Sequence, residues 1–173
     1  FDFKPDDPEA YCRIKLINDT DHHNKGYYLQ IDYDVFSSQS AFNGVWFQLN
    51  RADLTPYNRI EMAIRGDPDK GFTDRFKIEF KSGNAKAYYI LKGITEKWKK
   101  FSIPVLEFNR ESGNFSWERV DEMLFVFEDW RLPVKEGRLY IDDIKFIATE
   151  KETKTKISPK ENIKKKSQIK ALI

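Results

Sequence analysis

Residues 74–81 alternate between charged and large apolar side chains, and no other feature restricts the fold of this chain as strongly. Phe76, Ile78 and Phe80 share one parity, and charged residues occupy the other. Because successive side chains of a β-strand point to opposite faces, the pattern predicts a strand with one face against an apolar core. The chain also holds 14 Phe, 8 Tyr and 4 Trp, residue types that favour pleated surfaces.

Other short alternating segments, separated by turn residues, predict further strands. We expect them at residues 11–16, 26–35, 44–50, 59–65, 85–92, 98–105, 122–129 and 138–148. This spacing predicts an all-β fold, an antiparallel two-sheet β-sandwich of the jelly-roll type with about eight or nine strands. Trp98 and Trp117 are expected in its core. A single helical turn is an alternative for residues 117–123, and no long helical periodicity is present.

Residues 149–173 differ in composition from the rest of the chain. They hold eight Lys, three Glu and no aromatic residue, which is typical of a segment that cannot bury enough apolar surface to fold. We therefore expect a sandwich domain at 1–148 and a flexible basic tail or linker at 149–173. The tail has a formal charge of +5, whereas the whole chain has +2. Residues 1–148 are therefore slightly acidic, and no nucleic-acid partner is expected. No apolar run reaches the ~20 residues of a transmembrane helix.

The sequence offers little for catalysis. Cys12 is the only cysteine and is expected to be a core residue, and the two histidines, His22 and His23, are neighbours in a polar loop. No phosphate-binding loop, nucleophile elbow or metalloprotease motif is present. Glu79 and Glu128 could form a glycosidase-like carboxylate pair if their strands are adjacent. No motif places an acid and a base together, so we predict that the protein is not an enzyme.

Seven short motifs resemble a known pattern when their order and spacing are taken together. They are GYYL at 26–29, NGVW at 43–46, DLTPY at 53–57, IRGD at 64–67, GITEKW at 93–98, FSIP at 101–104 and LYIDDI at 139–144. The chain is similar to carbohydrate-binding modules of the galactose-binding-like jelly-roll type, in particular the family-eleven modules. It is also similar to the complex I intermediate-associated protein domain. The resemblance covers most of residues 1–148.

The resemblance to these modules implies a non-catalytic domain that targets an attached or partner glycoside-active enzyme to an oligo- or polysaccharide. An adjoining catalytic domain would suit the linker-like tail. An extracytoplasmic or secreted location is expected on the same ground. The intermediate-associated relatives imply a protein-interaction or assembly domain instead, and this alternative stays open.

The resemblance also implies a structural calcium ion. In similar modules an acidic residue near the N-terminus and the first Asp of the closing motif share the ion, and Asp2 and Asp142 match these positions. Asp142 and Asp143 lie in opposite phases, each with apolar neighbours, so at least one carboxylate is expected to approach the core. A buried carboxylate needs a cation or several donors. The alternative is that Asp142 accepts backbone N–H groups or pairs with an arginine.

Sugar recognition needs flat aromatic faces for the C–H side of the ring and planar polar groups for the hydroxyls. Residues opposite in parity to the core-facing side are the candidates. We expect carbohydrate-binding roles for Tyr28, Trp46, Gln48, Arg65, Lys77, Glu79, Tyr88, Glu128 and Trp130, with Gln30 and Asp32 beside the first of them. The alternative for each aromatic residue is packing under a loop.

Overall fold

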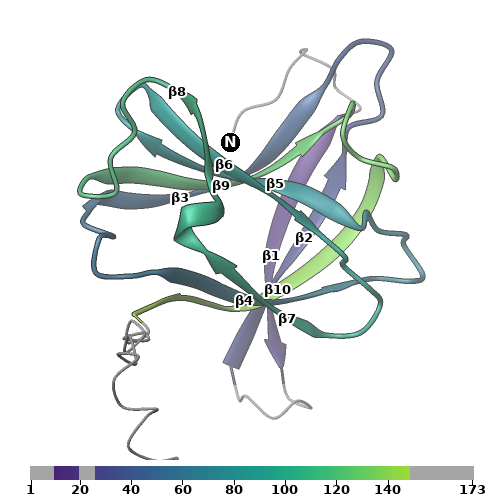
Figure 1. The fold of residues 1–173 in the computed structure, drawn as a ribbon. Helices are drawn as coiled ribbons and strands as arrows, with labels where there is room; N and C mark the ends of the chain where they lie inside the picture. Colours follow the sequence, from purple (N-terminus) through teal and green to yellow (C-terminus); the bar gives the residue numbers. More distant parts are fainter. Residues whose placement is uncertain (1–9, 20–25, 149–173) are drawn as a thin grey trace, which may run out of the picture.

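The computed structural model describes residues 10–19 and 26–148, which form two antiparallel five-stranded sheets packed face to face (Figure 1). The first sheet has the strand order β1-β2-β10-β4-β7, and the second has the order β3-β9-β5-β6-β8. In chain order the strands are β1 Tyr11–Asp19, β2 Gly26–Asp34, β3 Phe42–Ala52, β4 Arg59–Gly66, β5 Arg75–Ser82, β6 Ala85–Lys92, β7 Lys99–Pro104, β8 Asn109–Ser112, β9 Val120–Glu128 and β10 Glu136–Ile147. The predicted all-β jelly-roll sandwich is confirmed.

The described residues leave some predictions untested. Asp2, the two histidines and the basic tail at 149–173 lie outside them. Within the described part of the chain, no helix is long and apolar enough to cross a membrane.

Two local predictions differ from the structure. Strand β8 was not predicted, because its four side chains are all exposed and carry no apolar alternation. The helical turn considered for residues 117–123 is wrong: β9 begins at Val120, and Met123 pairs with β3 and is buried. Among the described residues the one helical turn is η1, Val105–Glu107.

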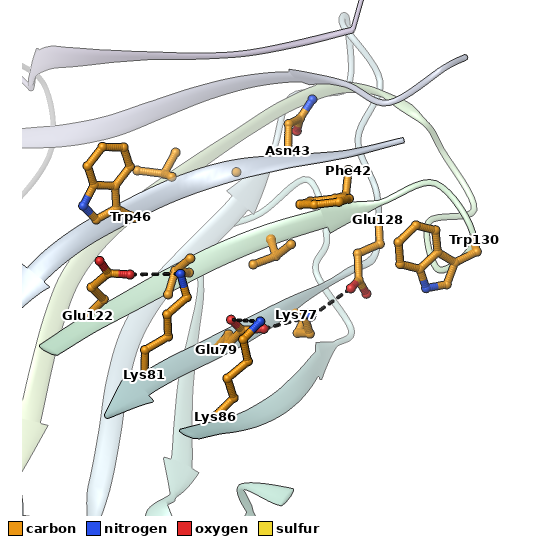
Figure 2. Close-up of a pocket in the computed structure, with 14 residues that line it drawn as sticks. Phe42, Asn43, Trp46, Lys77, Glu79, Lys81, Lys86, Glu122, Glu128 and Trp130 are labelled. Atoms are coloured by element: carbon orange, nitrogen blue, oxygen red, sulfur yellow. Dashed lines mark ion pairs between the residues drawn. The ribbon is translucent and has the colours of Figure 1, made fainter. Parts of the chain in front are cut away.

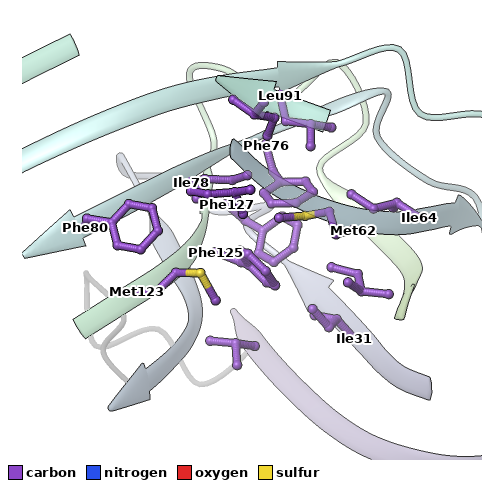
Figure 3. Packing of buried hydrophobic residues seen from close by; sticks show 14 of the residues in the cluster. Ile31, Met62, Ile64, Phe76, Ile78, Phe80, Leu91, Met123, Phe125 and Phe127 are labelled. Carbon is purple, nitrogen blue, oxygen red and sulfur yellow. The ribbon is translucent and has the colours of Figure 1, made fainter. Parts of the chain in front are cut away.

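Aromatic side chains fill the space between the two sheets (Figure 3). Phe76, Ile78 and Phe80 of β5 face inward and are almost completely buried, as the alternation predicts. Phe125 of β9 meets the ring of Phe76 edge-on, with centroids 5.3 Å apart. Such ring pairs stabilise the fold by more than the apolar area that they bury.

Tyr33 of the first sheet stacks on Phe127 of the second, with ring centroids 4.5 Å apart and planes 2° from parallel. Cys12 is buried, as expected, and burial raises the pKa of its thiol to about 12. Trp117 packs against the core, also as expected. The prediction for Trp98 is wrong, because it has the opposite parity to Phe101 and lies half-buried on the outward face of the first sheet.

A bulge in β10 changes which side chains face the core. The register against β4 shifts after Asp142, and Asp143 takes a positive φ of 54°. As a result Ile141 before the bulge and Ile144 after it both pack against the core, although they are three residues apart. The expectation that Asp142 or Asp143 approaches the core is wrong: Asp142 pairs with Ala63, on the face of β4 opposite to the buried Met62 and Ile64, and Asp143 pairs with the exposed Lys145.

Candidate functional site

The outward face of the second sheet carries a groove of about 500 Å³ (Figure 2). Trp46 of β3 and Trp130, just after β9, stand at its two ends, with a row of charged side chains between them. The two indoles are 45% and 56% exposed. Each therefore offers a large, flat apolar surface to a molecule lying in the groove.

The sequence around Trp46 explains why this end of the groove is open. Val45 and Phe47 pack on the core side, so Trp46 points outward. Gly44 lies on the same outward face as Trp46. A Cβ atom at Gly44 would lie 2.2 Å from the carbonyl oxygen of Phe125, so no side chain fits there. The floor beside the indole is bare backbone, which leaves room for a ligand.

The other end of the groove is fixed by a tight turn. The N–H groups of Arg131 and Leu132 donate to the carbonyl oxygen of Glu128, at 2.9 and 3.1 Å. Within this turn the ring of Trp130 meets the ring of Phe42 edge-on, with centroids 6.5 Å apart. Trp130 is thus held in place by the turn and by an aromatic neighbour.

Alternating charges form the floor between the two indoles. Lys77 Nζ lies 3.0 Å from a carboxylate oxygen of Glu79 and 2.8 Å from one of Glu128. Glu79 also pairs with Lys86 at 3.2 Å, and Glu128 pairs with Arg131. We call these five residues the ion-pair ladder, and Figure 2 shows its central pairs as dashed lines.

The centre of the ladder is buried although it lies on an outward face. Lys77, Glu79 and Glu128 are 6%, 3% and 6% exposed. Burial lowers the pKa of the Lys77 ammonium, but the ion pairs with Glu128 and Glu79 outweigh that effect and raise it above its usual value. Buried charges persist only when they are paired with good geometry. The ladder therefore holds its carboxylates in fixed positions before any ligand arrives.

The predicted sugar-binding residues divide between the two sheets. Five of them line the groove: Trp46, Lys77, Glu79, Glu128 and Trp130. Gln48 and Tyr88 lie on the same sheet, with Gln48 exposed and the Arg131 guanidinium 6.0 Å from the centroid of the Tyr88 ring. Tyr28 and Arg65 lie on β2 and β4 of the first sheet and do not reach the groove.

Sequence reasoning missed several groove residues. Lys81 has the same parity as Lys77 and pairs with Glu122 at 3.0 Å, so the alternation alone could have identified it. Lys86 stands opposite Lys81 across the β5–β6 hairpin. Its place depends on the register of that hairpin, which alternation does not give. Phe42 carries no signal in the sequence beyond its aromatic ring.

Glu79 and Glu128 come close together, because β5 and β9 are neighbours in the sheet. The ammonium of Lys77 lies between them. In a glycosidase, the bond to be cleaved would have to occupy that space. The geometry therefore does not provide a catalytic carboxylate pair.

Asp142, a predicted calcium ligand, forms a local hydrogen bond in the structure. Its Oδ1 accepts the backbone N–H of Asp143 at 2.7 Å, as one of the alternatives proposed. Within residues 10–19 and 26–148, no three His, Cys, Asp or Glu side chains are grouped so that they could hold a metal ion. Asp2 lies outside this part of the chain.

The fold and the groove define a class: a β-sandwich module with an open, aromatic-edged surface for a ligand. Residues 13–148 match the family described as carbohydrate binding domain 30. The chain belongs to this family and is a non-catalytic carbohydrate-binding module. The match confirms the resemblance stated above, and it gives no support to the protein-assembly alternative.

Solved structures share the fold at low sequence identity. A family 11 carbohydrate-binding module from Clostridium thermocellum, in complex with a β-1,3-1,4-mixed-linked tetrasaccharide, has a TM-score of 0.64 and 19% identity, covering 82% of this chain and 85% of that one. The crystal structure of a family 30 carbohydrate-binding module has a TM-score of 0.61 and 17% identity, covering 87% of this chain and 82% of that one. The family 30 module of a cellulosomal cellulase from Clostridium thermocellum has a TM-score of 0.60 and 16% identity, covering 80% of this chain and 83% of that one. No curated protein sequence matches the chain.

Replacing Lys77 with Met tests whether the ladder holds the groove together. The variant leaves Glu79 and Glu128 buried beside an apolar side chain, so the free energy of unfolding at pH 7 should fall by about 3 kcal/mol. The pKa of the Lys77 ammonium is raised in the folded protein, so its stabilising effect should persist at neutral pH and the loss should shrink only as the pH rises above the usual lysine value. Urea unfolding at several pH values measures both effects.

The matched control is Lys81→Met, on the same strand and the same face. Its ion pair with Glu122 is about one-third exposed, so the loss should be about 1 kcal/mol or less. Equal losses in the two variants would contradict the role given to the buried ladder.

Proposed function

We propose that the groove between Trp46 and Trp130 is the carbohydrate site and that it binds a stretch of a neutral β-linked glucan. The observation that carries the proposal is the pair of exposed indoles at the ends of a floor whose charges are already paired. Indole faces suit the apolar C–H side of sugar rings. Between them, carboxylate oxygens fixed by the ladder can accept hydrogen bonds from sugar hydroxyls.

The neutral character of the sugar follows from the charge pairing. Glu79, Glu122 and Glu128 each have at least one cationic partner. The lining lysines are all engaged in these pairs. Among the described residues that line the groove, no unpaired cation is therefore left to attract an acidic sugar. A carboxylate in the ligand would also meet the glutamates, and like charges repel.

The length of the groove supports a chain of several sugar units over a single sugar. Trp46 pairs with Leu124 of β9, and Glu128 is four residues further along the same strand. At ~3.3 Å per residue, about 13 Å separate these two levels. Trp130 lies beyond Glu128, so the indoles are far enough apart to contact different rings of one oligosaccharide.

Two alanine variants test the site. Trp46→Ala and Trp130→Ala should each weaken binding of mixed-linked β-1,3-1,4-glucan about tenfold or more, because each removes one stacking surface, a loss of at least ~1.4 kcal/mol. Isothermal titration calorimetry with an oligosaccharide measures this directly. Leu106→Ala, an exposed apolar residue on η1, is the matched control and should bind like the original protein. Unchanged affinity in both tryptophan variants would rule out the groove as the site.

We further propose that the module works outside the cytoplasm, attached to or beside a glycoside-active enzyme. The family 30 module that shares its fold is part of a cellulosomal cellulase, which supports this role. Binding of the module to a polysaccharide would raise the local concentration of substrate at the enzyme.

A structural calcium ion, with Asp142 and Asp2 as ligands, is also a proposal, and it is supported by the family resemblance alone. An ion that binds only the folded state raises the melting temperature. Adding excess calcium chloride to EDTA-treated protein should therefore raise Tm by several degrees, and Asp142→Asn should abolish the gain. An unchanged Tm would contradict the proposal.

A further inference from the structure

Four planar side chains gather on the outward face of the first sheet, on the opposite side of the molecule from the groove. They are Tyr28 of β2, Tyr140 of β10, Arg65 of β4 and Trp98, just before β7. The Arg65 guanidinium carbon lies 4.1 Å from the centroid of the Tyr140 ring and 5.4 Å from that of Trp98. We call this set the Arg65 cluster.

Tyr28 contacts both other rings of the cluster. Tyr28 meets Tyr140 edge-on at 5.4 Å and Trp98 edge-on at 5.9 Å. Each ring therefore has an aromatic neighbour, and the guanidinium lies against two of them. Cation–π contact of this kind orients an arginine without using its hydrogen bonds.

Arg65 lacks the polar partners that its charge requires. Its Nε is buried and has no hydrogen-bond partner, and no carboxylate among the described residues forms an ion pair with it. Buried donors are almost always satisfied, so an unsatisfied one calls for a specific explanation. The side chain is half-buried on this face, and its guanidinium forms no ion pair with a described residue.

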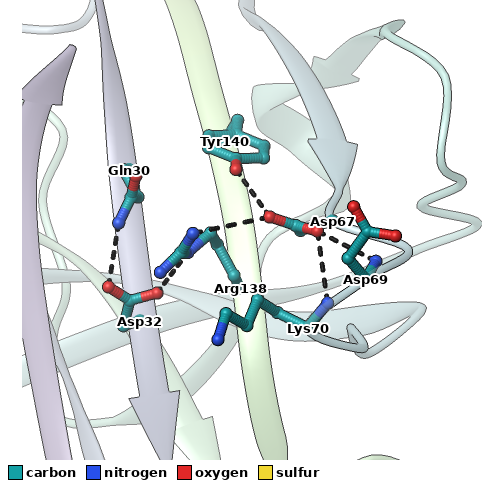
Figure 4. A network of polar contacts seen from close by, with 7 residues as sticks. All are labelled: Gln30, Asp32, Asp67, Asp69, Lys70, Arg138 and Tyr140. Atoms are coloured by element: carbon teal, nitrogen blue, oxygen red, sulfur yellow. Dashed lines mark hydrogen bonds and ion pairs between the residues drawn. The ribbon is translucent and has the colours of Figure 1, made fainter.

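The carboxylates around the cluster are already occupied (Figure 4). Asp67 accepts the Tyr140 hydroxyl at 2.6 Å and two backbone N–H groups. Burial raises the pKa of Asp67, but these hydrogen bonds outweigh it and hold that pKa below its usual value. Asp32 pairs with Arg138 and accepts the Gln30 side-chain amide at 2.9 Å. None of these groups is left for Arg65.

Glu61, on the same strand as Arg65, is occupied as well. It pairs with Lys100 at 2.6 Å and accepts the Ser102 hydroxyl at 3.0 Å. The described residues therefore leave no carboxylate to pair with the guanidinium of Arg65, and a carboxylate of a ligand could take that place. A guanidinium binds a carboxylate through two parallel hydrogen bonds, its strongest pairing.

We propose that the Arg65 cluster is a second carbohydrate site, one that binds an acidic sugar unit such as a uronic acid. Arg65 binds the sugar carboxylate, and the half-buried Trp98 and Tyr28 rings contact the apolar face of the sugar. This site is independent of the groove, where every charge is paired within the protein. The two faces thus differ in ligand chemistry: neutral chains on the second sheet and acidic units on the first.

Nuclear magnetic resonance of the indole N–H groups tests the two sites separately in the full chain. Polygalacturonic acid oligomers should shift the Trp98 signal and leave Trp46 and Trp130 unchanged, and mixed-linked β-glucan should do the reverse. Trp98→Phe identifies the Trp98 signal. Raising the salt concentration should weaken binding of the acidic oligomer, because the contact is between charges that are partly exposed.

Arg65→Met should weaken binding of the acidic oligomer at least tenfold as measured by the remaining Trp98 shift. Arg59→Met is the matched control, since Arg59 lies on the same strand and face but already donates to Ser102 at 2.7 and 2.8 Å. It should bind like the original protein. Well-dispersed amide signals in the spectrum of each variant show that it is folded.

Three results would overturn the proposal. One is binding of the acidic oligomer without any Trp98 shift, as the basic tail alone could produce. Another is an unchanged response in Arg65→Met, and the last is an equal Trp98 response to the neutral glucan. Failure of the groove to bind β-glucan would leave the Trp98 result unaffected, so the two proposals fail independently.

Discussion

Strand β5 is buried on both of its faces, and this constraint connects the fold to the groove. Its inward side chains, Phe76, Ile78 and Phe80, form the centre of the core. Its outward Lys77 and Glu79 are equally buried, but in ion pairs that reach β6 and the end of β9. Moving the strand by one residue would exchange these two sets and disrupt both the core and the floor of the groove. Core packing and ligand site therefore share one register.

Properties that depend on neighbouring residues along the chain could be predicted from the sequence. Alternation at 74–81 was sufficient to predict a strand and its core face, since the period of two is local. The burial of Lys77 was not predictable, because it requires Glu128 from a strand far along the chain. Parity placed Tyr28 and Arg65 on outward faces, but only the strand order shows that they share the first sheet. The bulge after Asp142 shifts the phase without any signal in the residue types.

The two outward faces show how pairing within a protein sets what the surface can accept. In the groove, each glutamate is balanced by a lysine or arginine, so the surface offers rigid acceptors without net attraction for a charged ligand. Beside Tyr140, the carboxylates are used by other partners and Arg65 is left over. Both faces combine aromatic rings with polar groups, yet the charges are paired in the groove and Arg65 has no ion-pair partner among the described residues. Residue composition alone does not distinguish the two faces, whereas the pattern of pairs does.

A crystal structure of the protein with a mixed-linked β-glucan tetrasaccharide would show whether the groove is the sugar site. The sugar should lie on the second sheet, with rings against Trp46 or Trp130 and hydroxyl groups within hydrogen-bond distance of Glu79 or Glu128. The side chains of the ion-pair ladder should keep their positions when the sugar binds, since they are already fixed. A tetrasaccharide bound elsewhere, with the groove empty, would show that the groove is not the carbohydrate site.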